Sequence, residues 1–247
     1  MADYEYKTIK IRYRMNEANN LQIAENQPLV IPDVSNCPFS IVFNEDCMEG
    51  LKRFPDNYFD LAVVDPPYGI GAENHAGNAD NGWKQWDKKS WDNAIPTAEY
   101  FEQLFRVSKN QIIWGGNYFA NLLPNSQGWI FWDKGQRDFS LADGELCWTS
   151  FKKSLRVFEM ARAKAKASIG YDKIHPTQKP VQLYDFCYNF AKLEKGNMVL
   201  DTHLGSGSSR ISANKGGFNF IGFETDKEYY EKQEKRFKNF TAQQRLF

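Results

Sequence analysis

Residues 61–68 constrain the fold of this chain more than any other stretch. Leu61-Ala62-Val63-Val64 is an apolar run that leads directly into Asp65-Pro66-Pro67-Tyr68. A short apolar run that ends in turn residues is typical of a parallel strand covered on both faces. Because two prolines cannot continue a strand ladder, the chain must leave the sheet at Asp65. We therefore predict an α/β fold with Asp65 at the carboxyl edge of the sheet, where such folds bind ligands.

The turn at residues 65–68 places an acceptor beside a flat aromatic ring. A planar substrate with an N–H group can stack on Tyr68, while the Asp65 carboxylate and a proline carbonyl accept from its amine. An ordinary strand followed by a Pro-Pro turn would have the same sequence, so this motif needs support from other parts of the chain.

Composition narrows the class of protein. A chain of 247 residues suits one α/β domain with a substantial core. The formal net charge is +0, so any anion-binding surface must be local. The four cysteines lack C-x-x-C spacing, which argues against a zinc site or a disulfide scaffold. With no signal peptide and no apolar run of about 18 residues, we expect a cytoplasmic protein that does not span a membrane.

The apolar patterns predict alternating strands and helices after an N-terminal extension, residues 1–40. That extension alternates polar and apolar residues, which indicates a small accessory hairpin or an oligomer contact. Strands are expected at residues 40–44, 61–64, 111–114, 128–133, 145–151, 197–201 and 218–224. Helices are expected at 48–54, 97–108, 117–123, 181–193, 208–215 and 226–240.

A second functional turn follows the strand expected at 197–201. Asp201-Thr202-His203-Leu204-Gly205-Ser206-Gly207 joins that strand to a helix, and the glycines let backbone approach a ligand closely. Glu224 ends the next strand about 20 residues later, a spacing that suits a carboxylate on ribose hydroxyls. The chain has no G-x-x-x-x-G-K-[ST] motif, which argues against ATP hydrolysis of the P-loop kind.

Two segments are candidates for contacting phosphates. Around residues 83–91, tryptophans alternate with lysines, a mixture that suits a nucleic-acid contact, although the rings can also simply pack the loop. Residues 151–173 hold seven basic and two acidic residues, a local charge of +5, although a solvated surface segment has a similar pattern. The candidate nucleic-acid contacts are Lys84, Lys88, Lys89, Lys152, Lys153, Arg156, Arg162, Lys164 and Lys166.

The motifs together resemble the amino-group DNA methyltransferases. They are Asp65-Pro66-Pro67-Tyr68, then His175-Pro176-Thr177-Gln178-Lys179-Pro180, then the turn at 201–207, and then Glu224. Their order is similar to that of the permuted group, in which the catalytic motif precedes the cofactor motif. The resemblance covers residues 41–240. It implies a class I S-adenosylmethionine-dependent fold, with a seven-stranded, mostly parallel sheet that has one antiparallel strand and helices on both faces. Residues 72–174 would then contain a mobile loop and the target-recognition region.

The resemblance also implies roles for individual residues. Asp65, Pro66, Pro67 and Tyr68 would form the catalytic tetrad. The residues implied to bind S-adenosylmethionine are Asp46, Asp65, Lys179, Asp201, Thr202, His203, Gly205, Ser206, Gly207 and Glu224. Asp201 and the glycine turn would hold its methionine part, Glu224 its ribose, Lys179 its carboxylate and Asp46 its adenine. The family usually has Asp-Pro-Phe where this chain has Asp201-Thr202-His203, so His203 replaces an apolar contact and has no expected catalytic role.

The resulting hypothesis is a site-specific adenine-N6 methyltransferase acting on double-stranded DNA, because the Asp-Pro-Pro-Tyr form of the tetrad is associated with adenine. The alternatives are cytosine-N4 methylation, methylation of RNA or of a protein amide, and an inactive module that binds DNA or a clamp. The family also makes a homodimer an expectation.

The last five residues, Gln243-Gln244-Arg245-Leu246-Phe247, form a separate motif. They resemble the short peptides that bind the bacterial sliding clamp, with Leu246 and Phe247 as apolar anchors. The same two residues could instead cover the protein's own core.

Overall fold

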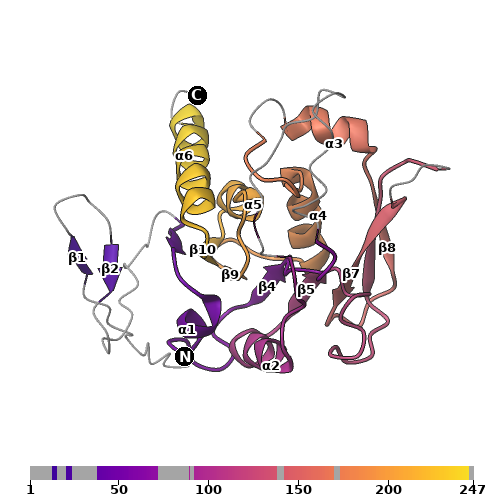
Figure 1. The fold of residues 1–247 in the computed structure, drawn as a ribbon, viewed down its shortest axis with the longest axis horizontal. Coiled ribbons are helices and arrows are strands. Elements are labelled where there is room, and N and C mark those ends of the chain that lie inside the picture. Colours follow the sequence, from indigo (N-terminus) through magenta and orange to yellow (C-terminus); the bar gives the residue numbers. More distant parts are fainter. Residues whose placement is uncertain are drawn as a thin grey trace, which may run out of the picture.

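The computed structural model describes residues 13–15, 21–23, 38–71, 89, 92–137, 142–169 and 173–244. Within these ranges the main sheet has eight strands in the order β3-β10-β9-β4-β5-β7-β6-β8, and helices cover both of its faces (Figure 1). The strands are β3 (Ser40–Phe43), β4 (Leu61–Val64), β5 (Gln111–Trp114), β6 (Trp129–Asp133), β7 (Gly144–Thr149), β8 (Arg156–Glu159), β9 (Met198–Asp201) and β10 (Asn219–Phe223). The helices are α1 (Cys47–Leu51), α2 (Ala98–Val107), α3 (Arg162–Ile169), α4 (Val181–Ala191), α5 (Ser208–Gly216) and α6 (Lys227–Gln244).

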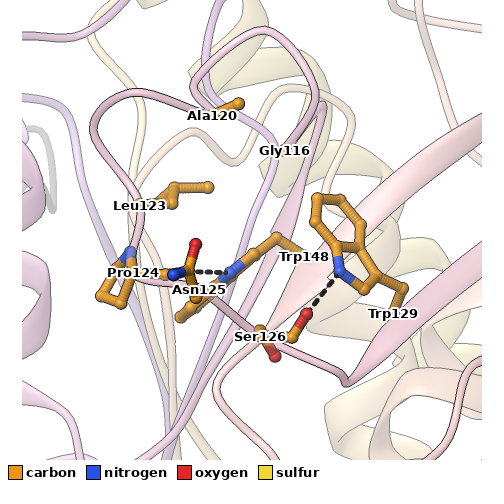
Figure 2. A pocket seen from close by; sticks show the side chains of 8 residues that line it. All are labelled: Gly116, Ala120, Leu123, Pro124, Asn125, Ser126, Trp129 and Trp148. Carbon is orange, nitrogen blue, oxygen red and sulfur yellow. Dashed lines mark hydrogen bonds between the residues drawn. The ribbon is translucent and has the colours of Figure 1, made fainter.

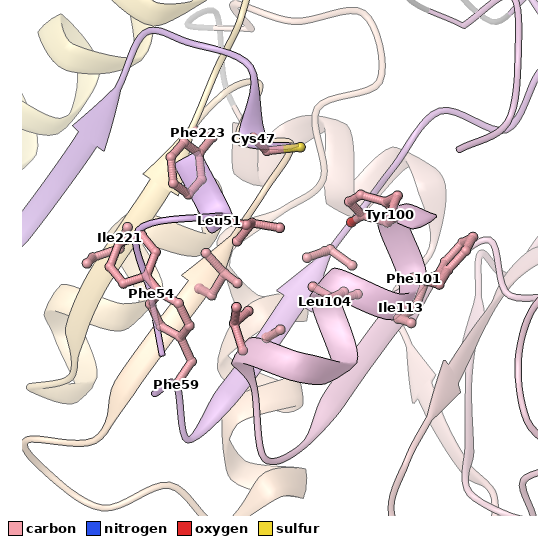
Figure 3. Packing of buried hydrophobic residues seen from close by; sticks show 14 of the residues in the cluster. Cys47, Leu51, Phe54, Phe59, Tyr100, Phe101, Leu104, Ile113, Ile221 and Phe223 are labelled. Atoms are coloured by element: carbon pink, nitrogen blue, oxygen red, sulfur yellow. The ribbon is translucent and has the colours of Figure 1, made fainter. Parts of the chain in front are cut away.

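The central strand β4 shows why the sheet has a core on each face. All four of its residues are buried. Ala62 and Val64 belong to the cluster on the α1–α2 side, whereas Leu61 and Val63 belong to the cluster on the α4–α5 side. Figure 3 shows part of the first cluster, where side chains of α1 and α2 meet those of the sheet. Burial on both faces explains the unbroken apolar run and confirms the prediction of a covered parallel strand.

The predicted fold class is confirmed, with one correction to the strand count. β7 is antiparallel to both of its neighbours, and the other pairings in the main sheet are parallel, as the resemblance implies. The sheet has eight strands and not seven, because β8 pairs in parallel with β6 at its outer side. β8 lies in the basic segment 151–173, for which the sequence predicts a phosphate-facing or solvated surface and no strand. Its charged ends and short length concealed the strand pattern.

One predicted helix is wrong, and most other elements agree to within a few residues. The helix expected at 117–123 is a series of turns. Thr97 caps α2 as predicted, with its hydroxyl accepting from the Tyr100 N–H. In the N-terminal extension, β1 (Tyr13–Met15) and β2 (Leu21–Ile23) pair antiparallel, as predicted for a hairpin. At the other end, α6 includes the first two residues of the clamp-like motif, and residues 245–247 lie outside the described ranges.

Two predictions from composition can be compared with the described residues. Cys47, Cys147 and Cys187 are buried free thiols, in agreement with the argument against a disulfide scaffold. No helix in the described ranges combines the length and the apolar character that crossing a membrane requires.

Candidate active site

The topology brings four predicted site carboxylates to one edge of the sheet. β3, β10, β9 and β4 are parallel neighbours, so their carboxyl ends lie side by side. Asp46 follows β3, Glu224 follows β10, Asp201 ends β9 and Asp65 follows β4. The carboxyl edge of such a sheet is where α/β folds bind ligands. The structure therefore brings together the predicted catalytic turn and the predicted cofactor turn.

The catalytic turn forms a compact polar network. Asp65 Oδ1 accepts from the Tyr68 hydroxyl and Oδ2 from Lys179 Nζ, each at 2.5 Å. Burial and the Asp65 charge raise the pKa of Tyr68 well above its ordinary value, so its hydroxyl remains a donor. Pro66 is buried, and no donor in the described part of the chain reaches its carbonyl oxygen. The tetrad thus contains the Asp65 carboxylate, which already accepts two hydrogen bonds, and the Pro66 carbonyl, which accepts none from the described residues.

Glu145 is a member of this network that the sequence analysis missed. It lies near the start of β7, which is antiparallel, so this end of β7 lies at the same edge as Asp65. Glu145 Oε2 is 3.2 Å from Lys179 Nζ, and Oε1 is 2.5 Å from Lys134 Nζ. Burial would raise the pKa of Glu145, but Lys179 and Lys134 hold it at about 2. Burial alone would lower the pKa of Lys179, but Asp65 and Glu145 outweigh that effect and raise it.

The Tyr68 ring is fixed by close packing. Gly115 lies against it with a φ of +75°, and a Cβ at this position would overlap the ring. Tyr118 stacks on Tyr68 with ring centroids 4.9 Å apart and an interplanar angle of 14°. The Tyr118 ring therefore covers part of one face of Tyr68, and Tyr118 itself is 41% exposed, so aromatic surface reaches solvent at this point. A planar ligand would meet a preformed stacking surface here.

Asp92 is a second residue that the motifs did not reveal. Its side chain is buried, and Oδ1 accepts from the backbone N–H groups of Tyr68 at 2.5 Å and Gly69 at 2.9 Å. Its carbonyl accepts from the Gly71 N–H at 3.1 Å. Asp92 therefore joins the two ends of the segment that follows the tetrad, and it fixes the backbone of the catalytic turn.

The predicted cofactor turn has the backbone shape that a close ligand approach requires. Gly205 and Gly207 have φ values of +52° and +72°, a region that favours glycine. Glu224 Oε2 accepts from the Gly205 N–H at 2.7 Å and so ties the end of β10 to this turn. Burial raises the pKa of Glu224. The glycine turn and the acid thus form one rigid unit at the end of neighbouring strands.

Asp201 is held by neutral donors. It is buried and accepts from the Ser209 hydroxyl at 2.5 Å and the His203 N–H at 3.1 Å. Burial raises its pKa to about 7. Burial also lowers the pKa of His203 to about 4, so this ring is neutral, in line with its interpretation as an apolar replacement. The Thr202 hydroxyl lies 2.7 Å from the Tyr100 hydroxyl, which links the turn to α2.

Asp46 and His175 have structural roles in this arrangement. Asp46 Oδ1 accepts from the Met48 N–H at 2.7 Å and caps α1. His175 packs on Tyr229 with ring centroids 4.3 Å apart, and burial lowers its pKa to about 3. The cap on α1 still leaves Asp46 at the edge of the sheet, beside the end of β10.

The basic residues predicted to contact DNA fall into different environments. Lys152, Arg156, Lys164 and Lys166 are exposed, and Arg162 is half-buried. Lys153 points into the protein, where it donates to the Phe190 carbonyl and lies over two phenylalanine rings. Lys89 pairs with Asp226 at 2.5 Å and Glu228 at 2.8 Å, and these acids raise its pKa against the effect of partial burial. Lys84 and Lys88 lie outside the described residues.

A pocket of about 380 Å³ lies between β6–β7 and the turns that follow β5 (Figure 2). Its two indole N–H groups are satisfied internally, since Trp129 donates to the Ser126 carbonyl and Trp148 to the Pro124 carbonyl. None of the predicted site residues line it. We therefore assign the chemistry to the carboxyl edge of the sheet and not to this pocket.

Comparisons with known proteins agree with this site. A family model described as DNA methylase, the N6/N4 type, matches residues 113–235. The type II methyltransferase M.HinfI of Haemophilus influenzae is 25% identical over 243 residues, covering 79% of this chain and 67% of that protein. M.HpaI of Haemophilus parainfluenzae is 26% identical over 235 residues, covering 77% of this chain and 72% of that protein.

Solved structures show the same fold. The complex of M1.HpyAVI with S-adenosylmethionine superimposes with a TM-score of 0.52 at 18% identity, covering 79% of this chain and 98% of that chain. The cytosine-N4-specific PvuII DNA methyltransferase gives 0.56 at 14% identity, covering 84% and 94%. Together with the sequence matches and the site geometry, these comparisons confirm the resemblance: the chain belongs to the amino-group DNA methyltransferases, which use S-adenosylmethionine.

Proposed function

We propose that this protein is a site-specific DNA adenine-N6 methyltransferase that acts on a base flipped out of the duplex. The single observation that carries the choice of base is the Asp65-Pro66-Pro67-Tyr68 form of the tetrad at the ligand-binding edge. An amine inside a duplex cannot be reached by the tetrad, so the base must leave the stack. Tyr68, extended by Tyr118, offers the stacking surface for it.

In the proposed mechanism, Asp65 and the Pro66 carbonyl accept hydrogen bonds from the exocyclic amine. The nitrogen lone pair of such an amine is delocalised into the ring, and these bonds localise it on the nitrogen. S-adenosylmethionine, when bound beside the tetrad, would supply the methyl group to this nitrogen, and its sulfur would keep the electrons of the lost carbon–sulfur bond. The extra proton on nitrogen leaves through Asp65 to solvent. The protein contributes mainly orientation and electrostatics.

The described residues fit the proposed methyl donor. S-adenosylmethionine supplies an activated methyl group on a sulfonium. Asp201 has neutral donors as its hydrogen-bond partners, and its raised pKa marks it as an anion that a ligand ammonium would stabilise. We propose that Asp201, with the turn at 205–207, holds the methionine part and that Glu224 holds the ribose. Asp46, Thr202 and His203 would line the same edge.

Tritium-labelled S-adenosylmethionine and unmethylated genomic DNA test the proposal. We expect label in DNA and, after digestion to nucleosides, in N6-methyladenine. Label in N4-methylcytosine would favour the alternative base, which the likeness to the PvuII enzyme keeps open. Label in RNA or protein alone would favour those substrates. No transfer from a folded sample that binds cofactor would favour an inactive DNA-binding module.

The exposed basic residues of β8 and α3 are the proposed phosphate contacts. Replacing Lys164 and Lys166 with glutamine should weaken DNA binding at all sequences and reduce the slope of log affinity against log salt by about 1 for each lost contact. The replacement of Lys153 by glutamine is the matched control, since Lys153 points inward. An equal salt effect from both changes would refute this surface.

Two further partners are proposals from the sequence. Residues 243–247 would bind a sliding clamp, and deleting them should abolish binding to a purified bacterial clamp; unchanged affinity would end that idea. A homodimer would show twice the chain mass in light scattering.

A further inference from the structure

The Lys179 ammonium lies between the carboxylates of Asp65 and Glu145, and it is closer to Asp65. Its Nζ is 2.5 Å from Asp65 Oδ2 and 3.2 Å from Glu145 Oε2, and its side chain is 5% exposed. Lys134 already occupies Glu145 Oε1. Glu145 Oε2 is buried and accepts no well-directed hydrogen bond within the described part of the chain. Glu145 Oε2 is therefore an acceptor close to Lys179 that has no well-directed donor among the described residues.

The proposed substrate amine must either share Asp65 with this lysine or displace it. Both oxygens of Asp65 have a donor at 2.5 Å, one from Tyr68 and one from Lys179. A neutral base amine is a weaker donor to a carboxylate than an ammonium. An ammonium that left Asp65 without reaching another anion would be a buried unpaired charge, which is strongly unfavourable. The site therefore needs a second anion within reach of Lys179.

We propose that Glu145 is a positioning residue that receives the Lys179 ammonium when the substrate amine takes Asp65 Oδ2. The inference rests on the proposed role of Asp65 as amine acceptor. Lys179 Nζ is now 2.5 Å from Asp65 and 3.2 Å from Glu145, so a small shift of the ammonium is enough to bring it closer to Glu145 than to Asp65. Lys179 pairs with Asp65 while the site is free, and the pair with Glu145 compensates the ammonium charge while the base is bound.

A double-mutant cycle tests the coupling. The rate of single-turnover methyl transfer to genomic DNA is measured for the wild type, Glu145→Gln, Lys179→Met and the double variant. We expect Glu145→Gln to slow transfer by about tenfold or more, with calorimetric cofactor affinity nearly unchanged. In the Lys179→Met background the same change should have little further effect, because no ammonium remains to be received.

Two further variants separate this role from a structural one. Lys109→Gln removes an ion pair outside this network, the 2.6 Å pair with Asp60, and should leave transfer close to that of the wild type. Glu145→Asp keeps the charge and should restore part of the rate; it also replaces Glu145→Gln if that variant does not fold. The inference would be overturned by additive rate losses in the cycle, by a wild-type rate for Glu145→Gln, or by an equal loss in Lys109→Gln. A wild type without transfer, or a fully active Asp65→Asn, would instead refute the proposed function.

Discussion

Two neighbouring strands of the sheet lead into an aspartate, and the protein compensates the two charges differently. Asp65, after β4, has a direct partner in the Lys179 ammonium. Asp201, at the end of β9, is held by a hydroxyl and a backbone N–H. Burial raises the pKa of Asp201 to about 7, which is the expected result when a buried carboxylate has no cation of its own.

The contrast matches the charge of the ligand proposed for each turn. S-adenosylmethionine carries an ammonium in its methionine part, so it would supply the cation that Asp201 does not find among the described residues. A base brings a neutral amine, so in the proposed mechanism Asp65 has a protein cation of its own, which moves toward Glu145 when the base binds. An aspartate at the end of a strand can therefore suit either a cationic or a neutral ligand. The presence of a neighbouring cation, as at Asp65, distinguishes the two turns.

The largest expected effect comes from adding a side chain at a glycine beside the catalytic turn or in the cofactor turn. Gly115→Ala places a Cβ into the Tyr68 ring and should reduce methyl transfer by about 100-fold, since small misplacements at a reacting centre are costly. Cofactor affinity should remain close to that of the wild type. Gly205→Ala is the counterpart, because a side chain at its φ of +52° should weaken cofactor binding first. Calorimetry and single-turnover kinetics on both variants check the distinction, and matching losses would break it.

Asp92→Ala should affect the catalytic turn and leave the cofactor turn intact. The N–H groups of Tyr68 and Gly69 lose their acceptor, so the free energy of unfolding should fall by about 1–3 kcal/mol. Methyl transfer should fall with it. Chemical denaturation and transfer assays measure both effects. Asp92→Asn keeps an oxygen acceptor and should recover most of the loss; if it does not, the charge of Asp92 matters more than its hydrogen bonds.

The pKa of Asp201 predicts a pH dependence for cofactor binding. In the unfolded chain this group titrates near pH 4, so the free folded protein holds an extra proton between about pH 4 and 7, and this group makes it less stable as pH rises through that window. Cofactor binding should favour the ionised form, so affinity should rise by up to about tenfold per pH unit toward pH 7 and then level off. Calorimetry from pH 5.5 to about 8 tests this, and Asp201→Asn should remove the dependence.

The smallest expected effect concerns the stacking surface. Tyr118→Ala removes one stacked ring, an interaction worth about 0.5–1.5 kcal/mol, so transfer should fall only a few-fold. Tyr118→Phe keeps the ring and is the control. Kinetics at varied DNA concentration should locate the loss in substrate affinity; a loss confined to cofactor affinity would contradict this role.

Local patterns were sufficient for the buried strands and for both turns. Gln111–Trp114 is a strand at the predicted residues, because the buried Ile112, Ile113 and Trp114 form a clear apolar run. The tetrad and the glycine turn were found because each is contiguous in sequence. The prediction of a helix at 117–123 is wrong because Gly115 and Tyr118 pack against the Tyr68 ring, which is distant in sequence. Such packing overrides local helical propensity.

The missed site residues act across long separations in sequence. Asp92 contacts Tyr68 across 24 residues, and Glu145 contacts Lys179 only through the fold. No motif marks either residue. One signal was available for Glu145, since the first residues of an antiparallel strand in such a sheet lie at the carboxyl edge of its parallel neighbours. The pairing of β8 with β6 was hidden in the same way by a basic segment.

One pair of variants tests the central contrast most directly. Asp65→Asn and Asp201→Asn are each measured for cofactor affinity by calorimetry. Single-turnover methyl transfer to DNA is then measured for each at cofactor concentrations that rise to saturation. The account predicts that Asp65→Asn binds cofactor nearly as well as the wild type but loses transfer by about 100-fold or more, whereas Asp201→Asn loses cofactor affinity and recovers transfer as cofactor is raised. Equal losses of cofactor affinity in both variants, or full transfer by Asp65→Asn, would contradict it.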